Sequence, residues 1–285
     1  MKYVTVHSGG REQLGVVTPH GIALIATINA DCGTQWSTEM FVLLQEGQLK
    51  ALTSWLQSQP ASSVREWKTI ASSELKYAPL YRHPRKIWGV GFNYTSDEEE
   101  LRRVDREVEP VGFMKPDTSL IGYGDTIQIP LQSERTIAEA ELAIIIGQTC
   151  KEISEDDALQ YVAGYAAVFD IGADDIHSSN PRYLTRSKSF DTFFSFGPEL
   201  VTTEELANLA DLTVATVRNG EVIARKPVGL MRYQPAFIVS FHSRFMTLLP
   251  GDVIMTGTPG SVVIRPGDCV ECRIDGFEPL VNIVK

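Results

Sequence analysis

A series of short apolar segments, rich in β-forming residues and separated by turns, does most to limit the possible fold. Three of these segments are AELAIIIG (140–147), YVAGYAAVFDIG (161–172) and GDVIMTG (251–257). The pair Asn219-Gly220, between two further β-rich runs, is the preferred two-residue turn of a β-hairpin. Segments with helical spacing are fewer, although PAFIVSFHSRFMTLL (235–249) is apolar enough to form a buried helix. The pattern predicts an α+β fold in which strands dominate.

The first part of the chain has a simpler pattern than the rest. Residues 3–25 alternate short β-rich runs with glycine turns, and residues 38–57 repeat apolar side chains at helical spacing. The segment YAPLYRHPRK (77–86) contains two prolines and is typical of a linker. We therefore expect a small N-terminal α+β domain and linker in residues 1–83 and a larger domain in residues 84–285.

Composition excludes several classes of function. A chain of 285 residues with 43% apolar residues can bury a substantial core. The formal net charge of -10 argues against a nucleic-acid surface, which needs a basic stripe. No apolar stretch approaches the ~20 residues that span a bilayer, and the N-terminus lacks the apolar core of a secretory signal. With only four scattered cysteines, these features predict a cytoplasmic protein without a membrane partner.

Two acids stand at the start of an apolar run that would otherwise be buried. Glu139 and Glu141 are two residues apart in RTIAEAELAIIIG, so in a strand their side chains share one face. Both could lie at a solvated strand end, or a cation could offset their charges. A third acid, Asp170, ends another strand-like run, YAAVFD. Three carboxylates that converge at strand ends offer hard oxygen ligands suited to Mg²⁺ or Mn²⁺.

The ordered set of motifs in the second part of the chain closely resembles the fumarylacetoacetate hydrolase family. The resemblance covers about residues 85–285, and each motif alone would be weak. It implies a mixed β-sandwich roll and a homodimer. The matching segments are GFNY (91–94), FMKP (113–116), EAELAIIIG (139–147), GYAAVFD (164–170), KSFDTF (188–193), NGE (219–221) and LPGDVIMTGTPG (249–260).

The resemblance also implies roles for particular residues. The metal ion would be bound by the family's E-x-E and D positions, and Lys188 would lie beside the substrate. Thr258 is either a hydrogen-bond donor to the substrate or a turn residue before a proline. The residues expected to bind substrate through the matched motifs are Thr258, Tyr94 and Lys115, and those expected to bind metal are Glu139, Glu141 and Asp170.

The sequence departs from the family where hydrolytic members carry a water-activating His–Glu pair on a lid. Asp97 occupies the histidine position and is followed by Glu100. A carboxylate with an ordinary pKa near ~4 is a poorer general base at neutral pH than an imidazole. The alternative is that these acids begin a helix, with a capping box from Ser96 to Glu99. Asp97 and Glu100 are therefore either catalytic or helix-start residues.

A second departure follows the third predicted metal ligand. The family's D-x-x-A-R-D-x-Q reads here with Asp174 in place of the arginine and His177 in place of the glutamine. Loss of the arginine removes a fork suited to a substrate carboxylate. His177 is either a replacement base or a structural histidine.

Three functions remain open. A 2-oxo acid bound to the metal would form an enolate when a C–C bond two carbons away breaks, and the metal and Lys188 would stabilise it. The leading hypothesis is a Mg²⁺- or Mn²⁺-dependent hydrolase that cleaves a C–C bond in a small 2,4-dioxo acid. The second is an oxaloacetate-type decarboxylase or a keto–enol or double-bond isomerase, which needs no water-activating base. The third is a metal-binding protein without catalysis.

Overall fold

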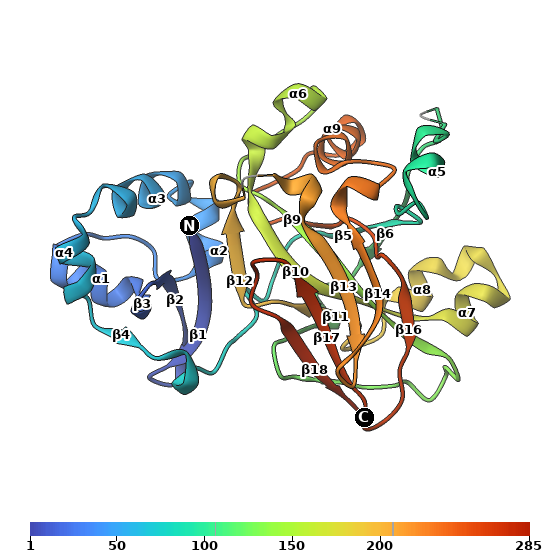
Figure 1. Cartoon of the computed structure of the whole chain (residues 1–285), viewed down its shortest axis with the longest axis horizontal. Coiled ribbons are helices and arrows are strands. Elements are labelled where there is room, and N and C mark those ends of the chain that lie inside the picture. Colours follow the sequence, from blue (N-terminus) through green and yellow to red (C-terminus); the bar gives the residue numbers. More distant parts are fainter. Residues whose placement is uncertain (106, 207) are drawn as a thin grey trace.

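The computed structural model describes residues 1–105, 107–206 and 208–285 and shows a mixed α+β fold with a large and a smaller sheet (Figure 1). In spatial order the large sheet contains β4 (Thr69–Ile70), β3 (Gly21–Leu24), β2 (Arg11–Thr18), β1 (Lys2–Ser8), β12 (Glu199–Thr202), β10 (Val162–Ala173), β9 (Thr136–Ile146), β15 (Val253–Met255), β5 (Ile87–Gly91) and β6 (Val111–Lys115), with β7 (Leu120–Gly122), β11 (Phe194–Phe196) and β16 (Ser261–Val263) paired beside this path. The smaller sheet contains β14 (Glu221–Pro227), β13 (Thr213–Arg218), β17 (Cys269–Ile274), β18 (Leu280–Val284) and β8 (Thr126–Ile127). The predicted β-dominated α+β class is confirmed.

Short helices cover the sheets and their edges. The α-helices are α1 (Ile25–Cys32), α2 (Met40–Gln45), α3 (Leu49–Ser58), α4 (Ala61–Glu66), α5 (Glu98–Arg102), α6 (Glu155–Ala158), α7 (Asp174–Ser179), α8 (Leu184–Lys188) and α9 (Pro235–Phe245). The 3-10 turns are η1 (Ser72–Glu74), η2 (Asp117–Ser119), η3 (Leu159–Tyr161), η4 (Pro181–Tyr183), η5 (Thr203–Glu205), η6 (Leu209–Asp211) and η7 (Val228–Leu230). Within the described ranges, no helix has the length and apolar character needed to cross a membrane. The cytoplasmic location stays a prediction.

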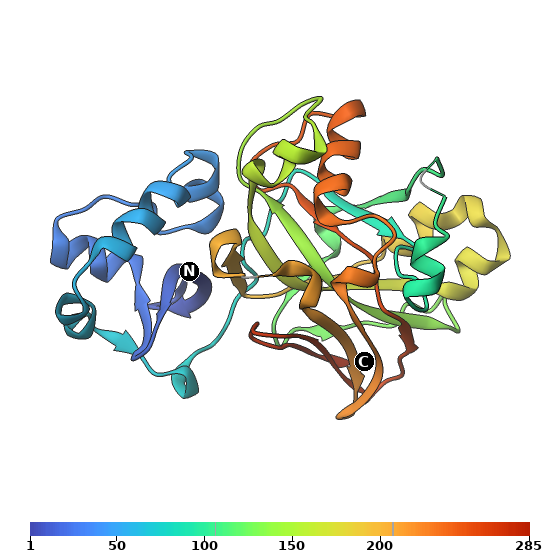
Figure 2. The same ribbon diagram turned by 45° about the horizontal axis from the view of Figure 1, so that its top comes forward.

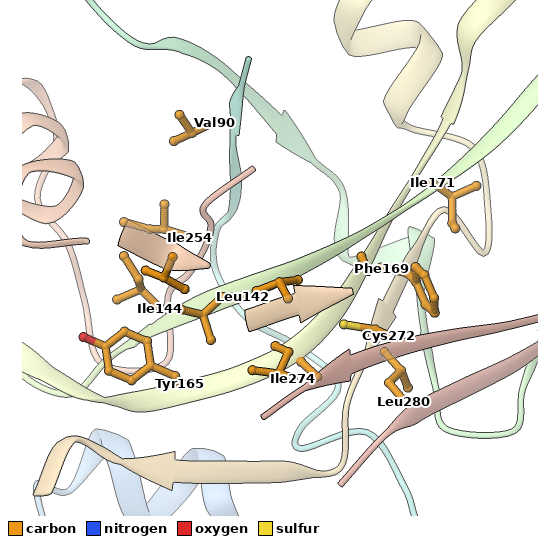
Figure 3. Close-up of a cluster of buried hydrophobic side chains, with 14 of the residues drawn as sticks. Val90, Leu142, Ile144, Tyr165, Phe169, Ile171, Ile254, Cys272, Ile274 and Leu280 are labelled. Carbon is orange, nitrogen blue, oxygen red and sulfur yellow. The ribbon is translucent and has the colours of Figure 1, made fainter. Parts of the chain in front are cut away.

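The long strands β9 and β10 form the centre of the molecule because both of their faces are buried. Leu142 and Ile144 of β9 face the smaller sheet and pack in one core with Cys272 and Leu280 (Figure 3). The alternate residues of β9, such as Ala143, belong to a second core on the opposite face. A strand buried on both faces needs apolar residues in succession, which explains the continuous run AIII.

The N-terminal elements are joined to the rest by backbone pairing as well as by the chain. Strands β1 to β4 and helices α1 to α4 lie at one side of the molecule in both views (Figures 1 and 2). Strand β1 pairs antiparallel with β12, with Tyr3 opposite Leu200, and so extends the large sheet. Between η1 and β5 the chain has no regular helix or strand. The division into domains at residues 1–83 and 84–285 stays a prediction.

The hairpin between β13 and β14 turns at Asn219-Gly220, as the sequence predicts. Both residues have positive φ, 53° and 82°, which is the backbone required by a type I′ turn. This hairpin forms the outer edge of the smaller sheet. Its last residues reach the cavity described below.

Candidate active site

Three carboxylates, two of them buried and that of Glu139 partly exposed, meet where β9 and β10 pair. Asp170 lies directly opposite Glu139 in the antiparallel register, and Glu141 lies two residues further along the same face of β9. Ligand atoms of the three side chains lie within 4.8 Å of one another. The acids do not end their strands, as the sequence suggested, because the pairing continues past them to Ala173 and Thr136. The ladder on both sides holds the carboxylates on a rigid surface.

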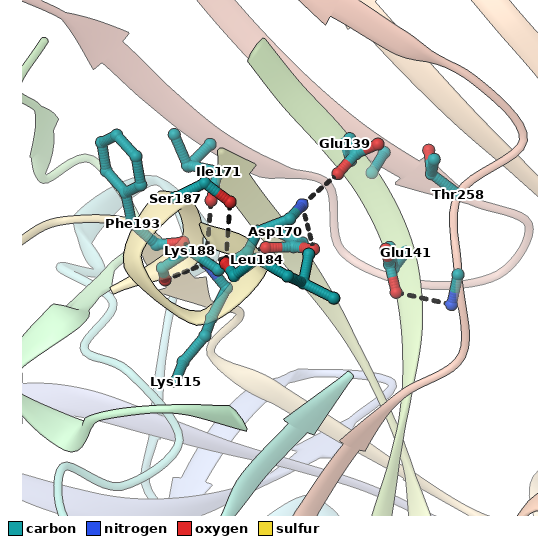
Figure 4. Close-up of polar contacts among 12 residues, drawn as sticks. Lys115, Glu139, Glu141, Asp170, Ile171, Leu184, Ser187, Lys188, Phe193 and Thr258 are labelled. Atoms are coloured by element: carbon teal, nitrogen blue, oxygen red, sulfur yellow. Dashed lines mark hydrogen bonds and ion pairs between the residues drawn. The ribbon is translucent and has the colours of Figure 1, made fainter. Parts of the chain in front are cut away.

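Lys188, the last residue of α8, reaches across two of these carboxylates. Its ammonium donates to Glu139 Oε2 at 2.5 Å and to Asp170 Oδ2 at 2.6 Å (Figure 4). Burial would lower the pKa of Lys188, but Asp170 and Glu139 together outweigh burial and raise it. Lys188 is therefore a fixed ammonium at the centre of the cluster, where it can stabilise negative charge on a ligand oxygen.

Glu141 is the carboxylate that Lys188 does not contact by a hydrogen bond. Its Oε2 accepts a hydrogen bond of 2.6 Å from the backbone N–H of Gly257, in the loop after β15. Burial, followed by the negative charges of Asp170 and Glu139, raises the pKa of Glu141 well above its ordinary value. A cation bound beside Glu141 would therefore stabilise the ionised form of this carboxylate.

Lys115 is buried beside Asp170 and is not one of the residues that line the cavity. Its ammonium donates to three carbonyl oxygens, at 2.7–2.8 Å, from Ile171, Lys188 and Phe193. The same nitrogen is 2.7 Å from Asp170 Oδ1. Burial lowers the pKa of Lys115 to about 8 despite the attraction of Asp170. This position does not fit the prediction that Lys115 contacts the substrate. The side chain of Lys115 is fully buried, and its ammonium donates its hydrogen bonds to backbone carbonyls.

The residues present fit a hard divalent cation. Asp170 Oδ1 is buried and, among the described residues, accepts no hydrogen bond, because the three N–H groups of Lys115 point to carbonyls. This oxygen therefore keeps its lone pairs for a ligand although a positive charge lies beside it. Oxygen donors from three carboxylates suit Mg²⁺ or Mn²⁺ better than zinc, which prefers nitrogen and sulfur. Glu139, Glu141 and Asp170 are the residues that would hold the ion.

A cavity of about 380 Å³ opens over the carboxylates. This volume suits a small organic ligand. Tyr94 is one of the lining residues, and its buried hydroxyl has no hydrogen-bond partner within the described chain. Thr258 also lines the cavity, but its hydroxyl is engaged locally with Gly260. Both residues were predicted to bind substrate, and that prediction remains open.

The two acids at the lid position lie outside the cavity. Asp97 is the N-cap of α5, and its Oδ1 accepts a hydrogen bond from the backbone N–H of Glu100 at 2.8 Å. Glu100 returns the contact by accepting from the backbone N–H of Ser96 at 2.7 Å. Backbone hydrogen bonding lowers the pKa of both carboxyls, which weakens them as bases. The predicted catalytic roles of Asp97 and Glu100 do not fit this geometry, and the cap is Asp97 rather than the predicted Ser96.

The second departure from the family pattern does reach the cavity. His177 and Asp174, both in α7, are among the residues that line it. Asp174 forms an ion pair of 2.6 Å with Arg135, so its charge is satisfied inside the chain. His177 is the only histidine among the described residues that line the cavity.

Lys226 and Phe92 are among the cavity residues that were not predicted from the sequence. Lys226 reaches the cavity from β14, and Phe92 lies at it with a positive φ of 55° and a side chain that is 76% exposed. Positive φ is uncommon for an aromatic residue and is concentrated at functional sites. No local sequence signal identifies Lys226, because its place in the cavity depends on the packing of the two sheets.

The fold and the site together define a class of protein in which a mixed sheet carries a cluster of carboxylates and a lysine inside a small cavity. The model of the protein family described as "Fumarylacetoacetate (FAA) hydrolase C-terminal" matches residues 86–285. The chain belongs to the fumarylacetoacetate hydrolase family.

Named relatives include both isomerases and hydrolases. The chain is 32% identical over 224 residues to a mitochondrial oxaloacetate tautomerase of Rattus norvegicus, covering 75% of this chain and 71% of the relative. A fumarylacetoacetate hydrolase from psychrophilic Exiguobacterium antarcticum has 28% identity and a TM-score of 0.84, covering 100% and 99% of the two chains. A maleylpyruvate hydrolase from Sphingobium, solved with manganese(II) and pyruvate, has 25% identity and a TM-score of 0.80, covering 100% and 98%. These similarities confirm the predicted family and its fold.

Proposed function

We propose that the protein is an isomerase that interconverts the keto and enol forms of a small 2-oxo acid of the oxaloacetate type. One observation carries this choice: the cavity joins three carboxylates with Lys188, whereas Asp97 and Glu100 lie outside it as helix-capping residues. Keto–enol interconversion requires a stabilised enolate and a proton carrier, but no attacking water. The rat relative is named an oxaloacetate tautomerase.

The reaction conserves every atom of the substrate. A base removes a proton from C3, the electron pair of the C–H bond becomes the C2–C3 double bond, and negative charge moves to the C2 oxygen. A proton then adds to that oxygen to give the enol. On this proposal His177 carries the proton at C3, and the ammonium of Lys188 and the hydroxyl of Tyr94 stabilise the charge on the oxygen; all three residues line the cavity.

Glu139, Glu141 and Asp170 would hold Mg²⁺ or Mn²⁺ in this site. When bound, the ion supplies positive charge next to the oxygen on which the enolate charge develops. The Sphingobium structure named above was solved with manganese(II) and pyruvate, which supports a divalent ion and a 2-oxo acid in the same fold.

The test is an assay of the enol form of oxaloacetate. Enol absorbance is followed after addition of protein with and without Mg²⁺, and the products are identified by NMR. We expect a Mg²⁺-dependent conversion to the keto form without release of pyruvate, and loss of this activity in Lys188→Met. Formation of pyruvate and CO₂ would instead assign a decarboxylase.

A second candidate is hydrolysis of a C–C bond in a 2,4-dioxo acid, the leading hypothesis from the sequence. His177 favours it, because a histidine in the cavity can activate water without the lid pair. A panel of acylpyruvates distinguishes the two: hydrolysis yields a carboxylic acid and pyruvate, and His177→Asn should abolish it. Metal binding without turnover of any substrate would leave the non-catalytic hypothesis.

We also propose a homodimer, on the family resemblance alone. Sedimentation velocity of the full chain at several concentrations tests it, and a single species with the mass of one chain, 31.6 kDa, would overturn it.

A further inference from the structure

Lys226 is a positively charged residue of the cavity, and it lies on a different strand from the three carboxylates. It lies on β14 of the smaller sheet, whereas Glu139, Glu141 and Asp170 lie on β9 and β10 of the large sheet. The cavity is therefore bounded by the carboxylate cluster on one sheet and by a lysine on the other.

The ammonium of Lys226 is held in place by the protein. It donates a hydrogen bond of 2.7 Å to the backbone oxygen of Thr95. Thr95 is fully buried, and its N–H and hydroxyl both donate to the carbonyl of Leu230, at 3.0 and 2.8 Å. Because only one of its three N–H groups is used there, Lys226 has two left for a ligand.

Lys226 also lacks an acidic partner. Among the residues that the structure describes, it takes part in no ion pair within 4.0 Å, in contrast to Lys188, which contacts both Glu139 and Asp170. The chain has a net charge of -10, so acidic partners are abundant. A partly buried cation at a cavity, with no described acidic side chain within ion-pair distance, is suited to an anionic ligand group.

The departure at residue 174 removes one possible anion-binding group from the cavity. The family's arginine at that place is Asp174 here, and Asp174 pairs with Arg135, whose side chain is 58% exposed and which does not line the cavity. The fork that could bind a substrate carboxylate is thus missing from α7. Lys226 supplies a positive charge to the same cavity from the opposite sheet.

We propose that Lys226 binds a second carboxylate at the far end of the substrate, so that the site selects 2-oxo dicarboxylic acids over 2-oxo monocarboxylic acids. The inference rests on the proposed 2-oxo acid site and names the substrate class of that site. One carboxylate and the 2-oxo group face the Glu139–Asp170 end with Lys188, and the other carboxylate faces Lys226. A cavity of about 380 Å³ has room for a small dicarboxylate in this orientation.

Binding of matched acids tests the proposal without requiring turnover. The pair 2-oxoglutarate and 2-oxovalerate has the same chain length and differs only in a terminal carboxylate or methyl group, and oxaloacetate with 2-oxobutyrate forms a shorter pair. Affinities are measured by titration calorimetry in the presence of Mg²⁺ for the wild type, Lys226→Met and Lys226→Arg. Arg225→Met is the matched control. Arg225 directly precedes Lys226 in β14, is exposed and pairs with Asp275, so the substitution removes a positive charge outside the cavity.

We expect the wild type to favour the diacid of at least one pair by about 10- to 100-fold, as a charged hydrogen bond provides. Lys226→Met should bring this ratio close to one by weakening the diacid, with the monoacid affinity kept within about twofold. Lys226→Arg should restore part of the preference, and Arg225→Met should retain it. An unchanged ratio in Lys226→Met, or an equal loss in Arg225→Met, would overturn the inference. A retained ratio without keto–enol turnover would overturn only the proposed reaction.

Discussion

Asp170 is the residue on which the candidate metal site depends most. It contacts Lys188 through one oxygen and keeps the other, Oδ1, without a hydrogen bond in the described structure. Asp170→Asn replaces one charged oxygen by an amide, and we expect it to lower Mn²⁺ affinity by more than about 100-fold, beyond the 10- to 100-fold typical of residues that only orient ligands. Asp174→Asn is the matched control in the same cavity and should bind Mn²⁺ as the wild type does. Equal affinities of the two variants in a titration would contradict the site.

Lys115 is expected to hold Asp170 and Lys188 in position. Because it joins the carbonyls of Ile171, Lys188 and Phe193, Lys115→Met should loosen the segments that carry Asp170 and Lys188. We expect a 10- to 100-fold loss of Mn²⁺ affinity, of the size seen for residues that orient metal ligands. Lys86→Met, which breaks the partly buried contact with Asp252 at 2.5 Å, is the control. If both variants lose thermal stability but retain Mn²⁺ affinity, Lys115 has only a structural role.

The sequence predicted the carboxylate cluster because the spacing of Glu139 and Glu141 determines that they share a strand face. The family motifs added Asp170 and Lys188. The sequence could not distinguish Lys115, which is buried, from a residue that contacts a substrate, because both roles use a lysine at the end of a strand. Lys226 was missed since its contact with the cavity arises between two sheets.

At the scale of the elements, the buried histidine of helix α9 should make the free energy of unfolding depend on pH. His242 is buried in this helix, packs against Trp88 and Phe245, and its Nδ1 lies 2.7 Å from the carbonyl of Ile238. Burial lowers its pKa from 6.5 to about 4. The unfolded chain therefore binds a proton at a higher pH than the folded chain, and stability falls as pH decreases from 6.5 towards 4, by on the order of 3 kcal/mol.

Denaturant titrations at several pH values measure this effect. His242→Gln should remove much of the loss of unfolding free energy between pH 6.5 and 4, whereas the exposed His83→Gln should keep it. A steep pH dependence that persists unchanged in His242→Gln would contradict the assignment.

The helix α5 shows why element boundaries were harder to predict than element types. Ser96 and Asp97 are both good N-cap residues, and the sequence alone favoured Ser96 with Glu99. In the structure Asp97 caps the helix and Glu100 reaches back to Ser96, a shift of one residue in the same capping pattern. The acids of β9 were predicted to share one face, but the start of β9 was placed too late and the end of β10 too early, because a polar residue in a paired strand resembles a strand end.

At the scale of the whole molecule, the N-terminal elements share a core with the large sheet. Leu52 of α3 and Ala143 of β9 belong to the same buried cluster, and β1 pairs with β12. We expect one cooperative unfolding transition in calorimetry, with coincident changes in fluorescence and circular dichroism. Leu52→Ala should lower the stability seen by both probes equally, by about 2–5 kcal/mol. Two separate transitions would show that residues 1–83 unfold independently.

The pairing of β1 with β12 lay beyond what the sequence could predict. The backbone hydrogen-bonding groups of either strand could pair with many other strands. No local sequence pattern specifies a partner about 200 residues away. The composition and the family motifs were sufficient for the class of fold, whereas the junction of the two parts depends on long-range packing.

Exchange of the C3 protons of a 2-oxo acid with D₂O, followed by NMR, tests the central claim most directly, because it reports enolate formation whatever the final product. We predict rapid exchange in oxaloacetate that requires Mg²⁺ or Mn²⁺, stops with EDTA, and is lost in Asp170→Asn and Lys188→Met while both variants remain folded. Absence of catalysed exchange in the metal-loaded wild type, or exchange that continues in both variants, would contradict an enolising site built on Glu139, Glu141, Asp170 and Lys188.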